Sequence, residues 1–375
     1  MMFADLAQQE AAVLKLIEDN PFVGQQEIAD ALGLARSTVA AHIVQLVQKG
    51  YILGRGYVLP HVSRVVCMGG AVFDRKYRAR QPLVPETSNP VDGMRSFGGV
   101  ARNVAENLGL LGASTSFISI LGDDETGSAL LAHLRQIGID VSQVLTNRER
   151  PTAEYAAVLD EKGDLSIGLA DMGIFDLFQP AHLEKVWPHL ASANLVFCDC
   201  NLPAETLRLL IERRKDARFR LAFDAVSTHK VMRLPDDLSG IDFLFMNLDE
   251  ANALMARRSL GPFRDAEAAA LALVNAGVSH AIVTRGASGA VVAEGTQVRA
   301  VPAVTAEPVE MTGAGDAMIA GTLQALLSGK PAFEAARIGT LLGALTTESA
   351  ASVHPELSPR FLEANMHRLQ PVERI

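Results

Sequence analysis

Short apolar segments alternate with helical patterns over most of this chain, and that alternation limits the folds that it can adopt. The first segment covers residues 65–69, and similar ones recur up to residue 284. Apolar segments of this length, separated by amphipathic helices, are typical of a parallel β-sheet with helices on both faces. We therefore predict an α/β domain over residues 64–375. The other expected strands are 116–121, 195–200, 221–224, 243–246 and 281–284.

Two segments interrupt the alternation. Residues 75–97 lack a helical stripe, and residues 153–170 have the pattern of two strands around the turn Glu161-Lys162-Gly163. Together they predict a small sheet that projects from the main one. Such a sheet can act as a lid over a site, and we place the lid segments at about 75–97 and 152–170.

Composition excludes several classes of protein. With 375 residues, the chain is long enough for at least two domains and a large core. A net charge of −9 argues against nucleic-acid binding by the whole chain, though not by one part of it. The three cysteines cannot all pair, and none has the spacing of a zinc finger. Acidic residues near the N-terminus argue against a signal peptide, and no apolar stretch could span a bilayer, so we expect a cytoplasmic protein without a membrane partner.

The first 60 residues have a different pattern. Three helical stripes follow one another, and then two short strands flank a glycine turn. Three helices and a hairpin predict a winged helix-turn-helix domain over residues 1–60, and the sequence resembles the domain of that type in bacterial regulators over about residues 8–59. The stripes are 6–17, 25–32 and 37–48, and the expected hairpin is 51–59.

The charges of this domain bear on DNA binding. Between Leu34 and Tyr57 there are basic residues and no acids, which places positive charge on the expected recognition helix and wing. A three-helix dimerisation or docking module is the alternative. The candidate DNA contacts are Arg36, Ser37, Thr38, Lys49 and Arg55.

The stretch Gly313-Ala314-Gly315-Asp316 carries the clearest chemical signal. Its small residues leave backbone amides open at the start of a helical pattern, where a phosphate is attracted. The carboxylate of Asp316 stands beside these amides and can take a proton from an attacking hydroxyl. The pairing predicts phosphoryl transfer to an alcohol, although glycines before a helix can also form only a tight turn.

A second stretch begins at Gly98-Gly99. The two glycines allow the backbone to approach a ligand and open another helical pattern. Asn103 lies one turn inside this helix, where its amide can bind vicinal hydroxyls. Packing between helices is also consistent with the pattern.

Together, the two stretches resemble the two sequence motifs of the ribokinase (PfkB) family of carbohydrate kinases, and the resemblance covers about residues 65–355. It implies a ribokinase-like three-layer αβα domain with a small β lid. It also implies ATP with Mg²⁺ and transfer of the γ-phosphate to a primary hydroxyl. The resemblance implies a catalytic role for Gly313, Ala314, Gly315 and Asp316, and substrate binding by Asp74, Gly98, Gly99 and Asn103. It implies that Asn247 and Glu250 position the phosphates and hold Mg²⁺ through water. It also implies that Thr284, Gly286 and Gly289 bind the nucleotide.

Within the family, Arg102 before the asparagine resembles pseudouridine kinases rather than ribokinase-type members. This implies that the acceptor is the 5′-hydroxyl of a nucleoside, most of all pseudouridine, with another nucleoside or a sugar as the alternative. Glu310 replaces an aspartate or asparagine, which leaves a requirement for a monovalent cation such as K⁺ open. Further implied substrate contacts are Ser88, Asn89, Thr152, Asp171 and Lys230, of which the last three could instead be a strand-surface residue, a turn carboxylate and a solvated cation.

The sequence leaves two functional hypotheses. The first is an ATP-dependent kinase with an appended DNA-binding domain. The second is a transcriptional regulator in which the kinase fold only senses a nucleoside or sugar. The presence of Asp316 favours the first. Because one small domain neutralises few phosphates, specific DNA binding would need a second copy, so we expect a homodimer.

Overall fold

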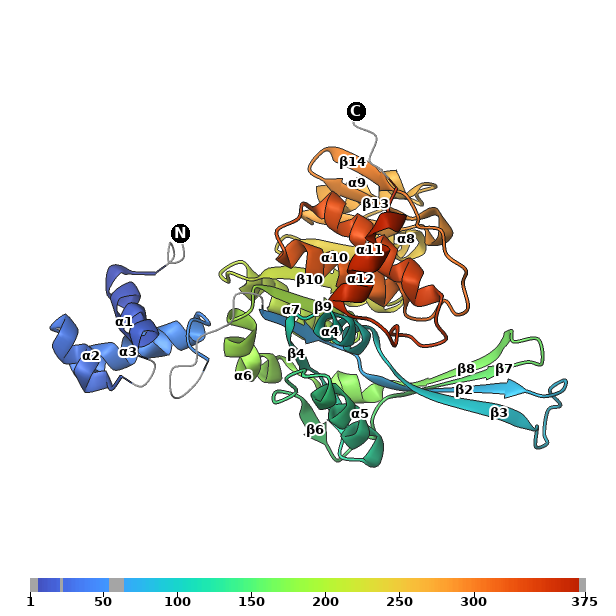
Figure 1. Ribbon diagram of the computed structural model, residues 1–375, viewed down its shortest axis with the longest axis horizontal. Helices are drawn as coiled ribbons and strands as arrows, with labels where there is room; N and C mark the ends of the chain where they lie inside the picture. The colour runs from blue at the N-terminus through green and yellow to red at the C-terminus, as the bar shows by residue number, and fades with distance from the viewer. Residues whose placement is uncertain (1–5, 21–22, 54–63, 371–375) are drawn as a thin grey trace.

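The computed structural model describes residues 6–20, 23–53 and 64–370. Its N-terminal part is a three-helix domain with a core of its own, as the sequence predicts (Figure 1). Each helix turns one apolar stripe toward this core, to which Val13 and Ile28 contribute fully buried side chains. The helices are α1 (Gln8–Asp19), α2 (Gln25–Leu32) and α3 (Arg36–Gln48).

The segment after α3 contacts the larger domain. The guanidinium of Arg218 lies over the ring of Tyr51, 3.5 Å from its centroid, and its Nη2 donates to the carbonyl of Lys49 at 3.4 Å. Gly50 lies so close to the backbone of Ala191 that no side chain would fit there. Of the predicted wing, residues 51–53 form no strand and the remainder lies outside the described residues.

The larger domain is built on an eight-stranded sheet with the order β14-β13-β12-β11-β10-β9-β1-β4. Six of these strands are parallel, which confirms the predicted sheet. The last two form an antiparallel hairpin at the edge, which the sequence analysis did not predict. The strands are β1 (Arg64–Met68), β4 (Ser114–Ile118), β9 (Leu195–Asp199), β10 (Arg220–Asp224), β11 (Phe243–Asn247), β12 (His280–Thr284), β13 (Ala290–Glu294) and β14 (Gln297–Val301).

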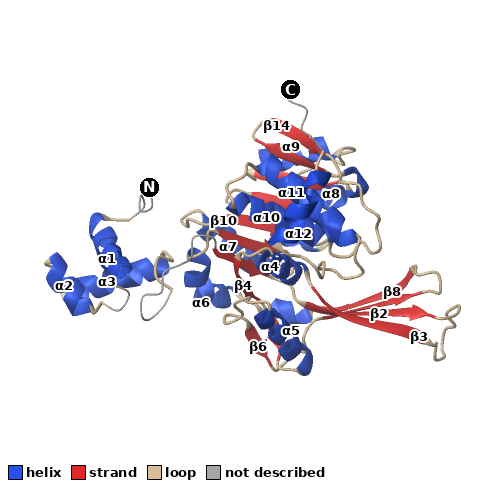
Figure 2. Ribbon diagram, in the orientation of Figure 1, coloured by secondary structure: helices blue, strands red, loops and turns tan. Residues whose placement is uncertain are grey.

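Helices cover both faces of this sheet and make a three-layer domain (Figure 2). The alternation of side chains along β1 shows why both faces are apolar: Val66 and Met68 enter one core, and Val65 and Cys67 enter the other. One face is covered by α6 (Pro180–Ala191), α7 (Ala204–Arg214), α8 (Leu248–Ala256) and α9 (Ala266–Asn275), and the other by α4 (Val100–Leu110), α5 (Glu125–Gln136), α10 (Ala314–Leu327) and α11 (Ala332–Thr347). Shorter elements are β5 (Ile120–Gly122), β6 (Leu145–Asn147), α12 (Pro359–Asn365) and the 3₁₀ turns Gly173–Leu177, Lys230–Arg233, Gly286–Ser288 and Met366–Arg368.

A second sheet of four strands extends from the main domain, on the side away from the N-terminal helices (Figure 1). Its order is β3-β2-β7-β8, so each of the two predicted lid segments supplies one antiparallel pair, and β2 joins them in parallel with β7. The separate small sheet is therefore confirmed. Its strands are β2 (Val72–Ala79), β3 (Val91–Gly98), β7 (Glu154–Leu159) and β8 (Leu165–Asp171).

Within the residues that the structure describes, no helix combines the length and the apolar character that crossing a bilayer requires.

Candidate active site

The Gly-Ala-Gly-Asp stretch forms the start of α10, as its composition predicts. Gly313 caps the helix with φ 85°, in the left-handed region that favours glycine, and a side chain there would overlap the backbone of Ser352. The amides of the first turn therefore remain accessible to a phosphate. Asp316 lies in this first turn, beside those amides.

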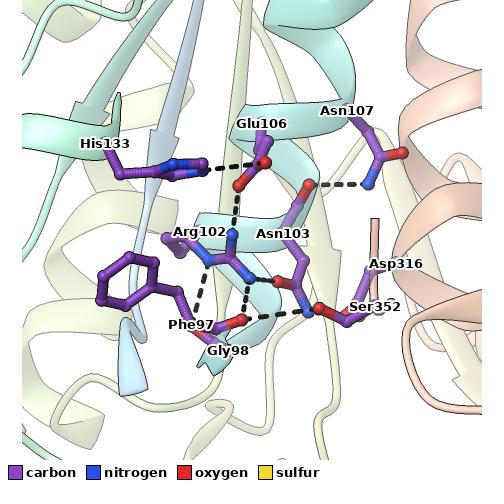
Figure 3. Close-up of polar contacts among 9 residues, drawn as sticks. All are labelled: Phe97, Gly98, Arg102, Asn103, Glu106, Asn107, His133, Asp316 and Ser352. Atoms are coloured by element: carbon purple, nitrogen blue, oxygen red, sulfur yellow. Dashed lines mark hydrogen bonds and ion pairs between the residues drawn. The ribbon is translucent and has the colours of Figure 1, made fainter. Parts of the chain in front are cut away.

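The glycine pair brings a second helix to the same place. Gly99 caps α4 with φ 95°, and its close approach to the backbone of Gly70 leaves no room for a side chain. One turn into α4, Nδ2 of Asn103 donates to Oδ2 of Asp316 at 2.6 Å, across 213 residues of sequence (Figure 3). The two motifs thus meet, and the amide that was expected to bind substrate hydroxyls contacts the predicted catalytic carboxylate.

A pocket of about 380 Å³ opens between the lid and α4, and Arg102, the neighbour of Asn103 in the sequence, lines it. Asp74 from β2 lines it, and a side chain at Gly98 would overlap the carboxylate of Asp74 in its present position. Phe97 and His133 add aromatic surface. We call this space the acceptor pocket.

A second pocket, of about 720 Å³, holds the residues that were predicted to bind the nucleotide. Thr284, Gly286 and Gly289 line it together with Ala314 and Gly315 from the start of α10. Thr312, a few residues earlier, lines the acceptor pocket. Met311, next to Thr312, lines the second pocket, so one loop supplies residues to both pockets.

Burial sets the charge state of the two carboxylates in this region. It raises the pKa of Asp316 to about 6, although the hydrogen bond from Asn103 and the charge of Arg102 lower it. Burial likewise raises the pKa of Asp74 to about 6, against the lowering effect of Arg102 and Lys76. Both groups are mostly ionised at neutral pH, and both are poised to take up a proton just below it.

The predicted Mg²⁺ residues lie where β11 ends and α8 begins. Asn247 and Glu250 form a reciprocal cap of α8: the Glu250 amide donates to Asn247 Oδ1 at 2.9 Å, and the Asn247 amide donates to Glu250 Oε2 at 2.8 Å. Burial raises the pKa of Asp224 at the end of β10 well above its usual value, and the charges of Glu250 and Asp316 raise it further. A cation at this point would relieve that repulsion.

No group of three or more His, Cys, Asp or Glu side chains that could hold a metal ion occurs in the described part of the chain. The carboxylates of Asp224 and Glu250 suit the way in which Mg²⁺ is usually held, by one or two carboxylates, several waters and phosphate oxygens. The donor set therefore fits hydrated Mg²⁺. Asp224 was missed by the sequence analysis, because a single aspartate at a strand end has no distinctive spacing.

Four other residues that were predicted to bind the substrate do not line the acceptor pocket. Thr152 is buried, and its hydroxyl donates to Oδ1 of Asp124 at 2.8 Å and accepts from the amide of Gly122 at 3.1 Å, so it completes the cap of α5. Ser88 and Asn89 lie in the connection between β2 and β3, at the far tip of the lid (Figure 1). The Asn89 side chain closes that turn through Nδ2 to the carbonyl of Val84 at 2.9 Å. Asp171 lies exposed at the end of β8.

Lys230 leads to a residue that the sequence analysis did not assign. Its ammonium donates to the side chain of Asn201, and burial lowers its pKa. Next to it, the fully buried carboxylate of Asp199 accepts from the amides of Gly70 at 3.0 Å, Ala101 at 2.9 Å and Asn201 at 2.9 Å. Asp199 therefore fixes the start of α4 against the end of β1. Its sequence signal was a carboxylate at the end of an otherwise apolar strand.

Two of the five predicted DNA contacts are exposed in the first turn of α3, where Arg36 and Ser37 face solvent, and Thr38 is partly exposed. Lys49 lies at the other end of α3, 2.7 Å from the carboxylate of Glu10, and beside the larger domain. Arg55 lies outside the described residues.

Comparison with known proteins agrees with this arrangement. Residues 62–358 match the family model for pfkB family carbohydrate kinases, and residues 8–52 match that for winged helix-turn-helix DNA-binding domains. A carbohydrate kinase from Agrobacterium tumefaciens has a similar structure, with a TM-score of 0.73 and 34% identity, over 82% of this chain and 98% of that one. This chain therefore belongs to the pfkB family of carbohydrate kinases, has the ribokinase-like fold and is an ATP-dependent kinase of sugars or nucleosides.

Two proteins of Escherichia coli K12 are similar to this chain over most of their length. The chain is 31% identical to the uncharacterized sugar kinase YeiI of Escherichia coli K12, over 93% of this chain and 96% of that protein. It is 28% identical to the pseudouridine kinase of the same organism, over 78% of this chain and 93% of that protein. The first match covers more of the chain than the pfkB region alone, so it includes part of the N-terminal domain.

Proposed function

We propose that this kinase transfers the γ-phosphate of ATP to the 5′-hydroxyl of a nucleoside, and that pseudouridine is its acceptor. The observation that carries the proposal is that the loop before Asp316 lines the acceptor pocket through Thr312 and the nucleotide pocket through Met311. A hydroxyl in the first pocket and a terminal phosphate in the second would lie on either side of that carboxylate. Similarity to pseudouridine kinases supports the choice of acceptor.

The residues divide the chemical work. The first-turn amides of α10, with Gly315 among them, would stabilise the charge on the transferring phosphoryl group. Asp316 would accept the proton of the 5′-hydroxyl as the new P–O bond forms and the bond to ADP breaks. Mg²⁺, held through water by Asn247 and Glu250, would neutralise phosphate charge. Closure of the lid would exclude water that competes for the phosphate.

The shape of the acceptor pocket favours a nucleoside over a simple sugar. Asp74 can bind ribose hydroxyls near Asp316. Beyond it, Phe97, Met94 and Val353 form an apolar wall that suits a planar base. A sugar without a base would leave this wall in contact with water.

Turnover with a panel of nucleosides and sugars, measured as ADP release, tests the acceptor. We expect pseudouridine to give the highest kcat/KM, and a higher value for a sugar such as ribose or fructose would contradict the proposal. Asp316→Asn should lower kcat by about 10²- to 10⁴-fold with little change in KM, because only the general base is lost. Asp216→Asn, a surface carboxylate at the opposite end of the sheet, is the matched control.

A second role is proposed for the N-terminal domain, namely DNA binding through the start of α3. The exposed position of Arg36 and Ser37 favours it, because recognition helices contact DNA through their N-terminal residues. Fluorescence anisotropy with DNA fragments from the neighbourhood of the gene should show binding that weakens with salt and with Arg36→Ala. Nucleoside-dependent DNA binding without turnover of any acceptor would instead favour the regulator hypothesis.

We also propose that two copies associate through the lid. The edge strand β8 exposes Ile167 and Leu169, each more than half accessible, at alternate positions and therefore on one face, and it also exposes Leu165 beyond a register shift in its pairing with β7. A second copy would cover this apolar face, which explains why aliphatic side chains are tolerated there. Light scattering should give a dimer for the wild type and a monomer for Ile167→Glu. A monomeric wild type would contradict this proposal.

A further inference from the structure

The side chain of Arg102 makes several hydrogen bonds next to Asn103, which in turn donates to Asp316. Only 2% of it is exposed, and its guanidinium reaches four partners (Figure 3). Nε donates to the carbonyl of Gly98 at 3.2 Å, Nη2 donates to the carbonyl of Phe97 and to Oδ1 of Asn103, and Nη1 pairs with the carboxylate of Glu106.

The network lies along the wall of the acceptor pocket, which Arg102 and Glu106 also line. The second oxygen of Glu106 lies 3.0 Å from Nε2 of His133 on α5, and His133 lines the pocket. Because the Glu106 carboxylate can only accept, His133 donates from Nε2. A continuous path of hydrogen bonds thus runs from His133 through Glu106, Arg102 and Asn103 to Asp316.

The orientation of the Asn103 amide follows from this path. A guanidinium can only donate, so Asn103 turns its oxygen toward Arg102 and its Nδ2 toward Asp316. The reversed amide would set two donors against each other at Arg102 and two acceptors against each other at Asp316. Without Arg102, the carboxylate of Asp316 would be the only group in this path that orients the amide.

We propose that Arg102 and Glu106 are positioning residues for phosphoryl transfer. Arg102 fixes the Asn103 amide as a donor to Asp316, and Glu106 holds the guanidinium in place and balances its charge. The inference rests on the proposed role of Asp316 as the base. A donor and a nearby cation both favour the ionised carboxylate, which is the form that can accept the hydroxyl proton.

Other charges around Asp316 act in the opposite direction. Asp74 faces it from β2, Asp199 from β9 and Asp224 from β10, and each of these carboxylates disfavours its ionisation. Arg102 offsets them from α4. Its charge is therefore part of what keeps Asp316 available as a base near neutral pH.

Two substitutions distinguish this positioning role from a general loss of structure, because they should shift the pH dependence of kcat/KM in opposite directions. Arg102→Met removes the cation and frees Asn103, so the acidic limb of kcat/KM should move to higher pH by about one unit or more. Glu106→Gln keeps Arg102 but removes its counter-charge, so the limb should move to lower pH. Arg102→Lys keeps the positive charge but lacks the planar guanidinium with its several donors. It should shift the acidic limb of kcat/KM less than Arg102→Met does, while kcat still falls.

The measurement is kcat/KM with ATP and pseudouridine between about pH 5 and 8. The charge of Arg102 also lowers the pKa of Asp74, so its removal raises the pKa of both carboxylates. The direction of the observed shift is therefore the same even if Asp74 and Asp316 titrate together. Arg337→Met is the matched control, because it breaks an ion pair with Glu334 on α11 that does not reach either pocket. Its profile should match the wild type.

Opposite shifts in the two variants would support the inference, and shifts in the same direction or unmoved limbs in folded variants would overturn it. Circular dichroism establishes folding, and if Arg102→Met does not fold, the direction of the Glu106→Gln shift decides. The two proposals can fail separately. Full turnover by Asp316→Asn would refute the proposed function, whereas unmoved limbs with an inactive Asp316→Asn would refute only the positioning role.

Discussion

Lys76 ties the lid to the loop before the phosphate-binding helix. Its ammonium on β2 lies 2.8 Å from Oε2 of Glu310 and 3.2 Å from the hydroxyl of Thr312. The other Glu310 oxygen accepts from the amides of Met311 at 3.0 Å and Thr312 at 3.1 Å, so one carboxylate organises both the loop and the lid strand. Burial would raise the pKa of Glu310, but Lys76 and Thr312 lower it to about 2. We expect Lys76→Met to loosen this connection.

The size of the effect follows from the shifted pKa. A change from 4.5 to about 2 corresponds to roughly 3 kcal/mol for all groups that hold the Glu310 carboxylate. Lys76 is one of these groups, and the exposed fractions of 26% and 32% allow solvent to screen the pair, so its share is about 1 kcal/mol. Because the folded-state pKa is depressed, this stabilisation is present above pH 4.5 and is lost as the pH falls toward about 2.

Urea unfolding at several pH values measures this share. The single tryptophan, Trp187, is buried in α6 and reports on unfolding of the kinase domain. Lys76→Met should lower the free energy of unfolding by about 1 kcal/mol at neutral pH and by less as the pH approaches 3. Lys76→Arg should retain most of the stability. Arg80→Met, which breaks an exposed pair with Asp92 in the same lid, should have no measurable effect. Equal stability of Lys76→Met and wild type at neutral pH, or a difference that grows on acidification, would refute the reasoning.

Three further predictions follow from the site and the domain contact. Gly99→Ala should destabilise the kinase domain by more than about 2 kcal/mol and remove turnover, whereas Gly138→Ala, at a similar φ but in open space, should cost only about 1 kcal/mol in thermal melts. Turnover should decline on the acid side with an apparent pKa of about 6, because burial raises the pKa of Asp74 and Asp316 to that value, and a flat profile would contradict this. Arg218→Ala should leave turnover unchanged but lower the melting temperature of the N-terminal domain, and unchanged melting would show that the contact adds no stability.

Most of the fold could be predicted from the sequence because its signals are local. An apolar strand and an amphipathic helix are each recognisable within about ten residues, and their order implies a parallel sheet with its ligands at the carboxyl edge. The hairpin of β13 and β14 was not predicted, and β14 has only a weak apolar pattern, because Gln297 and Arg299 interrupt it. The N-terminal helices were predicted to within two residues at each end, since glycines mark two of their ends.

The candidate site was less predictable because its contacts join distant segments. Asp316 and Asn103 were identified from motifs, but their hydrogen bond to each other was not. Glu106 and His133 were missed altogether, since neither has a motif and each gains its role only when α4 and α5 pack together. Thr152 shows the converse: its residue type fits a substrate contact, but the cap of α5 already engages its hydroxyl.

The placement of the two domains constrains any link between catalysis and DNA binding. The pockets lie at the carboxyl ends of the strands, whereas the N-terminal domain contacts Ala191 and Arg218, just before β9 and β10 begin (Figure 1). A nucleoside in the acceptor pocket therefore cannot touch α3. The most direct connection is β9 itself, which starts beside that contact and ends at Asp199, the carboxylate that fixes the start of α4. If nucleoside binding controls DNA binding, Arg218→Ala should abolish that control and leave kinase turnover intact. Control that survives this substitution would rule out this route.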